Sequence, residues 1–116
     1  MSTRSMIALQ KEDGTLEAVY CHYDGYPEGV GKTLKEHYQD PDKVERLIEG
    51  GGMSCLAPDV EDCEYYTGWG EKLKIYTAPN TSALAKESKE LWCEYLYVYD
   101  PSQDTENKWL ITDLHN

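Results

Sequence analysis

The glycine-rich stretch GYPEGVGKT, residues 25–33, is the first place to look for chemistry. Glycines followed by lysine and threonine between a strand and a helix are typical of loops that hold nucleotide phosphates. A Walker loop needs the spacing G-x-x-x-x-G-K-[ST], and counting back from Gly31 puts Tyr26 where the first glycine belongs. A proline within the stretch also removes one N–H donor, so we reject a Walker loop. Gly29 and Gly31 still lead into a predicted helix start, which either holds an anion beside Lys32 or simply needs glycines for a tight corner.

His22 and Asp24 are the second candidate, because alternate residues of a strand point to the same side. With Tyr20 they share one face of the strand predicted for residues 17–23, and Cys21 points to the other face as a small buried thiol. A histidine beside a carboxylate can act as an oriented base, which makes the two residues candidates for catalysis. The alternative, which the sequence favours, is a structural role in which both bond the turn that follows.

Tyrosine is the dominant aromatic residue, with Tyr 10, Trp 3 and Phe 0. In the strand predicted for residues 94–100, Leu96 and Val98 belong to a helix-covered core, and three tyrosines form a row on the opposite face. That row lies beside Tyr20 and His22 if the two strands are neighbours. It is either an exposed docking surface or a second small core covered by residues 53–71. The candidate ligand- or partner-binding residues are therefore Tyr20, His22, Asp24, Tyr26, Gly29, Gly31, Lys32, Tyr95, Tyr97 and Tyr99.

The elements that must position these residues follow from hydrophobic spacing and from turn and cap residues. The predicted order is strand 5–10, strand 17–23, helix 30–38, helix 41–49, a mostly irregular segment 53–71, strand 73–77, helix 82–92, strand 94–100 and strand 108–114. Either Asn80 or Thr81 caps the third helix. The order ββααβαββ predicts one α+β domain over residues 1–116, with a small, largely antiparallel sheet and helices packed on one face.

The chain is strongly acidic, with Asp+Glu 22 against Lys+Arg 11 and a formal net charge of -11. Phosphate backbones are bound by displacing counterions with Lys and Arg, so we expect no direct binding of nucleic acid. The charge favours a basic protein partner instead. The four cysteines lack zinc-type spacing, and we expect no metal and no cofactor. Without a signal-like or membrane-spanning apolar run, we expect a cytoplasmic protein that does not enter a membrane.

Several segments together resemble a known group of proteins: STRSMIAL at residues 2–9, VYCHYDGYPEGVG at 19–31, LKEHYQDPDKVERLIEGGGMSCLAP at 34–58, and EYLYVYD at 94–100 with a later Lys-Trp. They resemble a family of small proteins encoded by tailed bacteriophages and prophages, in which the central motif usually reads C-H-W-D-G-Y-P. Tyr23 stands here where tryptophan is usual. The resemblance is close over residues 2–58 and loose over 93–110. It implies an accessory protein outside the virion, made in the cytoplasm of an infected bacterium, and it carries over no catalytic residues.

The resemblance and the charge together predict a binding protein rather than an enzyme. Its function would be to inhibit or sequester a bacterial host or defence factor by covering a basic surface, such as one that binds nucleic acid. The first alternative is a protein that binds a nucleotide-like small ligand with the Tyr/His face and the helix start after CHYDGYP. The second is a small hydrolase that uses His22 and Asp24.

Overall fold

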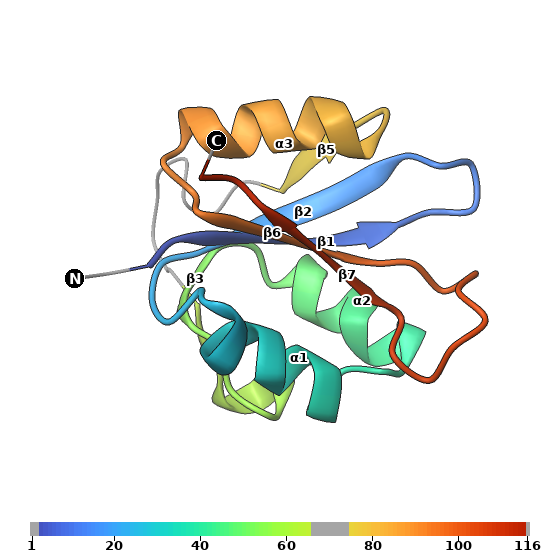
Figure 1. The fold of residues 1–116 in the computed structure, drawn as a ribbon. Helices are drawn as coiled ribbons and strands as arrows, with labels where there is room; N and C mark the ends of the chain where they lie inside the picture. The colour runs from blue at the N-terminus through green and yellow to red at the C-terminus, as the bar shows by residue number, and fades with distance from the viewer. Residues whose placement is uncertain (1–2, 66–74, 116) are drawn as a thin grey trace.

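The structure, a computed structural model, describes residues 3–65 and 75–115. The described residues form one sheet of seven strands in the order β4-β3-β2-β1-β6-β7, with β5 also paired to β2 (Figure 1). The strands are β1 (Ser5–Gln10), β2 (Leu16–Cys21), β3 (Met53–Cys55), β4 (Glu64–Tyr65), β5 (Tyr76–Ala78), β6 (Tyr95–Tyr99) and β7 (Trp109–Asp113). The helices are α1 (Lys32–His37), α2 (Pro41–Glu49) and α3 (Thr81–Glu90), with a π-helical turn η1 (Pro27–Gly31) and a 3₁₀ turn η2 (Val60–Asp62).

The sheet is mostly antiparallel, which confirms the predicted α+β class. β1 lies at its centre, antiparallel to β2 and parallel to β6. The irregular segment predicted for residues 53–71 contains the short strands β3 and β4 as far as residue 65. Residues 66–74, which include the rest of that segment and the start of the strand predicted at 73–77, lie outside the described residues. The neighbouring strand is found at Tyr76–Ala78.

Helices cover both faces of the sheet, so the prediction of one covered face is wrong. α1 and α2 lie on one side and α3 on the other, as Figure 1 shows. In β1, Ile7 and Leu9 belong to the core beneath α1 and α2, whereas Met6 and Ala8 belong to the core beneath α3. Strands buried on both faces read as continuous apolar runs, and the central strands of this sheet have that pattern.

The two longer helices begin where side-chain caps satisfy the first free N–H groups. Asp40 accepts from the N–H of Asp42 at 3.0 Å to start α2. Asn80 accepts from the N–H of Ala83 at 2.9 Å to start α3, which confirms Asn80 among the two predicted caps. Among the described residues, no helix is long and apolar enough to cross a membrane.

Candidate functional site

The corner between β2 and α1 is built from close backbone contacts that only glycine permits. The Gly25 N–H donates to the Thr3 carbonyl at 2.9 Å, and a Cβ on Gly25 would lie 2.6 Å from that same oxygen. A Cβ on Gly29 would lie 2.4 Å from the carbonyl oxygen of Asp24. Asp24 itself adopts φ 58, in the left-handed region that Asp tolerates better than most residues. Of the two interpretations of the glycines, these contacts support the tight corner.

The backbone N–H groups at the helix start donate within the corner. The Gly29 N–H donates to the Tyr26 carbonyl at 2.9 Å, and the Val30 N–H donates to the Asp24 carbonyl at 2.8 Å. The Tyr97 hydroxyl donates to the Gly25 carbonyl at 2.6 Å, which ties the corner to β6. An anion at this turn would have to replace these internal bonds, so the geometry gives no support to the predicted anion site.

His22 and Asp24 each have a tyrosine partner in this corner. The His22 Nδ1 lies 2.7 Å from the Tyr20 hydroxyl, and the His22 ring packs edge-on against Tyr23 with ring centroids 4.6 Å apart. The Tyr26 hydroxyl donates to Asp24 Oδ1 at 3.3 Å, and the nearby charge of Asp24 raises the pKa of Tyr26. These pairs hold the turn in shape, which favours the structural role of the two residues over catalysis.

The row of tyrosines on β6 is not an exposed docking surface, because Tyr97 and Tyr99 are 0% exposed. They pack in the core beneath α1 and α2, with residues of the 53–65 segment completing that core. Burial raises the pKa of both phenols. Tyr95 at the end of the row is half-buried against the ring of His115.

Tyr20 does not lie beside this row, because the two strands are not neighbours and the prediction depended on their being so. In the register of the sheet, Met6 of β1 pairs with Tyr20 on one side and with Leu96 on the other. Tyr20 therefore shares the α3 face with Leu96, and the tyrosines of β6 point to the opposite face. Strand β1 lies between β2 and β6. Whether Tyr20 and the β6 tyrosines share a face of the sheet therefore depends on how β1 pairs with each of these strands, which the sequence does not show.

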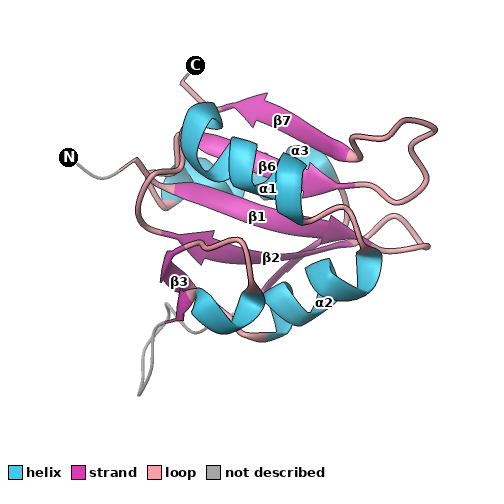
Figure 2. Ribbon diagram, turned by 90° about the horizontal axis from the view of Figure 1, so that it is seen from below, coloured by secondary structure: helices cyan, strands magenta, loops and turns pink. Residues whose placement is uncertain are grey.

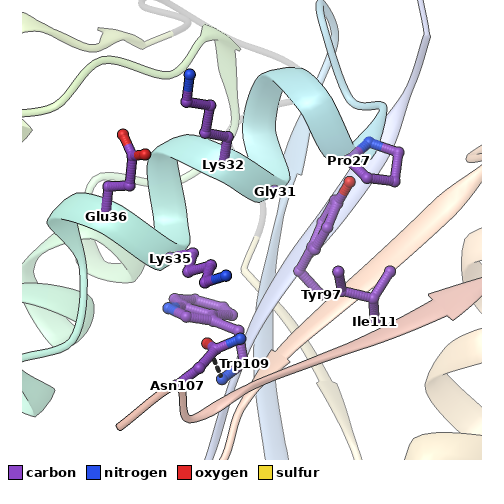
Figure 3. Close-up of a pocket in the computed structure, with 9 residues that line it drawn as sticks. All are labelled: Pro27, Gly31, Lys32, Lys35, Glu36, Tyr97, Asn107, Trp109 and Ile111. Atoms are coloured by element: carbon purple, nitrogen blue, oxygen red, sulfur yellow. Dashed lines mark hydrogen bonds between the residues drawn. The ribbon is translucent and has the colours of Figure 1, made fainter.

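A small cleft brings together three of the predicted residues, Gly31, Lys32 and Tyr97 (Figure 3). It lies between α1 and the β6–β7 hairpin and has a volume of about 270 Å³. Its other side chains, chiefly Lys35 and Trp109, were not predicted from the sequence. Lys35 extends along the Trp109 indole, while Lys32 points away from it. At the base of the cleft, both N–H groups of Trp109 already have hydrogen-bond partners. The ring N–H donates to the Tyr38 carbonyl at 2.8 Å, and the backbone N–H donates to the Asn107 side chain at 3.1 Å.

A strongly acidic surface surrounds α2 and η2, which pack against each other. We call it the acidic face and define it by its eight exposed carboxylates, Asp40, Asp42, Glu45, Glu49, Asp59, Glu61, Asp62 and Glu64. Residues 40–64 hold only two cations, Lys43 and Arg46, so this segment carries a net charge of 2 − 8 = −6. Both cations bridge the two elements, since Arg46 lies 3.5 Å from Glu61 and Lys43 lies 3.8 Å from Asp59.

Lys43 also holds the base of the acidic face in place. Its ammonium donates to the carbonyl of His37 at 2.8 Å and to that of Pro58 at 2.7 Å, and it lies 4.5 Å from the centre of the Tyr38 ring. The lysine thereby ties the end of α1 to the loop before η2. The carboxylates around it are presented on a braced scaffold.

Among residues 3–65 and 75–115, no group of three or more His, Cys, Asp or Glu side chains is placed to hold a metal ion. The four cysteines are free thiols, and burial raises the pKa of Cys21 to about 12, as expected for a structural thiol. No protein-family model, curated protein or solved structure matches the chain.

Proposed function

We propose that the protein is a small acidic binding protein that captures the basic surface of a partner protein through the acidic face. The single observation that carries this proposal is the gathering of eight exposed carboxylates on α2, η2 and β4, where the two cations are already engaged. A cluster of one sign attracts a partner of the opposite sign and accelerates its association.

The scaffold beneath the acidic face supports this function. α2 buries Val44, Leu47 and Ile48 in the core and leaves its carboxylates outward. Because the helix is fixed by burial and by its Asp40 cap, little backbone freedom is lost when a partner binds. Charged side chains on a rigid element are thus preorganised for a complementary basic surface.

The class of partner that fits is a bacterial host or defence protein with a surface that binds nucleic acid. Such a surface is lined with Lys and Arg that contact phosphates, and carboxylates spaced along a helix and a neighbouring turn can occupy them in the same way. The resemblance to small phage-encoded proteins supports this cellular setting. Binding of this kind would inhibit the partner by excluding its nucleic acid.

Charge reversal on the acidic face tests the proposal. The triple variant Glu45→Lys, Glu49→Lys and Asp62→Lys changes side chains that are exposed. Partners captured from a bacterial lysate by the unmodified protein should be lost, and their binding should weaken as ionic strength rises. The matched control reverses three exposed carboxylates elsewhere, Glu12, Asp104 and Glu106.

The comparison of the two triple variants decides the outcome. Both change the net charge by the same amount, so an effect of overall charge would weaken capture equally. Loss of capture only in the acidic-face variant supports the proposal. If that variant captures the same partners as strongly as the control, the acidic face is not the binding surface.

The nucleotide-like ligand and the hydrolase remain predictions that the geometry favours less. The cleft of about 270 Å³ is smaller than most small-molecule sites, which commonly occupy about 300–1,000 Å³. Its aromatic rings are buried and offer no free face to a base, since Tyr97 is 0% and Trp109 5% exposed. A thermal-shift panel of linear and cyclic nucleotides tests the ligand, and loss of turnover in a folded His22→Ala variant tests the hydrolase.

A further inference from the structure

Among the described residues, β7 forms one edge of the sheet, and its outward backbone groups can be identified from its bonds to β6. The Asp100 N–H donates to the Lys108 carbonyl, and the Leu114 N–H donates to the Glu94 carbonyl. Even-numbered residues of β7 therefore bond to β6, because bonded positions alternate along an antiparallel strand. The N–H and C=O groups of the odd-numbered residues Trp109, Ile111 and Asp113 point away from the sheet.

This edge carries exposed apolar side chains on both faces of the sheet. Leu110 is 45% exposed next to Val98 on the α3 face, and Ile111 is 51% exposed next to Tyr97 on the α1 face. Edge strands of monomeric proteins are usually protected by a central lysine, a proline or a bulge. The centre of β7 reads Leu-Ile-Thr and has none of these, although Lys108 and Asp113 flank it.

We propose that β7 pairs with the β7 strand of a second copy of this chain, antiparallel and centred on Ile111, to form a symmetric dimer. The proposal goes beyond the capture of a partner by the acidic face. Each Ile111 would exchange two hydrogen bonds with Ile111 of the second copy, because its N–H and C=O both point outward. On either side, the Asp113 N–H would donate to the Trp109 carbonyl of the other copy.

The hydrogen-bond ladder between the two copies has a defined end on each side. Trp109 pairs with Asp113 of the second copy, and the Trp109 N–H is already capped by the Asn107 side chain at 3.1 Å. The ladder therefore ends at Trp109 instead of continuing into the loop. On the α1 face the two Ile111 side chains meet, and on the α3 face each Leu110 meets Thr112 of the other copy. Both exposed apolar residues are then covered.

Charge complementarity identifies a second copy as the occupant of this edge. In the proposed register, Asp113 of the second copy lies opposite Trp109 on the α1 face, where Lys35 extends along the indole (Figure 3). Asp113 bonds His115 through Oδ1, so its Oδ2 can accept from Lys35. Two-fold symmetry forms this ion pair twice, and the second copy thereby completes the cleft described above.

The large net charge of -11 does not prevent this pairing, because the charge is concentrated elsewhere. Figure 2 shows β7 at one edge of the sheet and α2 near the opposite edge, beside β2 and β3. The two acidic faces of the dimer would therefore point outward and away from each other. Added salt screens their residual repulsion, so dimerisation should persist at a salt concentration that releases a captured basic partner.

Sedimentation velocity over a range of protein concentrations tests the dimer. The unmodified chain should reach twice its mass of 13.3 kDa, whereas Ile111→Lys should raise the dimer Kd at least about tenfold, because the two lysines would face each other. The matched control is Ile75→Lys, which adds the same charge at an isoleucine that is 39% exposed outside β7. A monomer at every concentration, or equal dissociation of the two lysine variants, would overturn the proposal.

Two further variants keep the test valid if Ile111→Lys unfolds. Ile111→Pro removes an outward N–H, a change that edge strands tolerate, and it should also yield a folded monomer. Lys35→Glu should weaken the dimer, and adding Asp113→Lys should restore it by reversing the ion pair. A double variant as weak as Lys35→Glu alone would contradict this register. None of these measurements uses a basic partner, so failure here is distinct from failure of the acidic face.

Discussion

Replacing Tyr97 with phenylalanine removes one oxygen that holds the β2–α1 corner against the sheet. The hydroxyl donates to the Gly25 carbonyl at 2.6 Å, and the residue is 0% exposed. Without the oxygen, the buried Gly25 carbonyl loses a partner that water cannot easily replace. A buried unsatisfied group costs about 1–3 kcal/mol, so we expect Tyr97→Phe to lower the free energy of unfolding by about 1–3 kcal/mol.

Urea denaturation followed by circular dichroism measures this loss, and the expected fall in Tm is about 4 °C per kcal/mol for a chain of this length. The matched control is Tyr99→Phe on the same strand. Its hydroxyl donates to the carbonyl of Gln39 at 2.9 Å, and Gln39 is only half-buried. We therefore expect water to replace the lost donor, and a loss below about 1 kcal/mol. If Tyr97→Phe is no more damaging than Tyr99→Phe, the Tyr97 hydroxyl does not lock the corner.

Three other predictions follow from the geometry. Gly29→Ala should lower the free energy of unfolding by about 1–3 kcal/mol, because its Cβ would lie 2.4 Å from the Asp24 carbonyl oxygen; an unchanged urea midpoint would contradict this. His115 should titrate by NMR above its ordinary pKa of 6.5, because its pKa is raised chiefly by the hydrogen bond that its ring donates to the Glu94 carboxylate. Its charged form then stabilises the fold below pH 6.5, and this contribution is lost as pH rises through the raised pKa; a midpoint at or below 6.5 would refute it. Burial raises the pKa of both Cys21 and Cys93 to about 12, so mass spectrometry should find them alkylated at pH 8 only after denaturation.

Local signals in the sequence were sufficient to predict the longer helices and the hairpins. Asp40 and Pro41 mark the start of α2, and its three buried residues follow a helical period. The short strands β3 and β4 were missed because two or three residues are too few to show a period of two. They form because the ends of β2 and of the segment after α2 meet in space, which depends on tertiary contacts.

The face of a tyrosine-rich strand could not be decided from the sequence. A tyrosine can lie at a polar surface or in a core where its hydroxyl finds a partner. The partner of Tyr97 is the carbonyl of Gly25, which is 72 residues away in the chain. Only the folded structure shows that such a partner exists.

For the candidate site, the sequence predicted the sign of the charge but not its location. The eight carboxylates of the acidic face are interrupted by Gly50, Gly51 and Gly52, and they come together because η2 folds back onto α2. Similarly, Lys35 and Trp109 are 74 positions apart and meet only where α1 lies over the β6–β7 hairpin.

The central position of β1 has a consequence for how the chain folds during synthesis. Ser5 of β1 pairs with Tyr95 of β6, so a ribosome must make 90 further residues before that ladder can form. Until then, the side of β1 that pairs with β6 has no partner strand. Long-range parallel pairing of this kind slows folding, and nascent chains that stop before β6 should be the main substrates of chaperones and proteases for this protein.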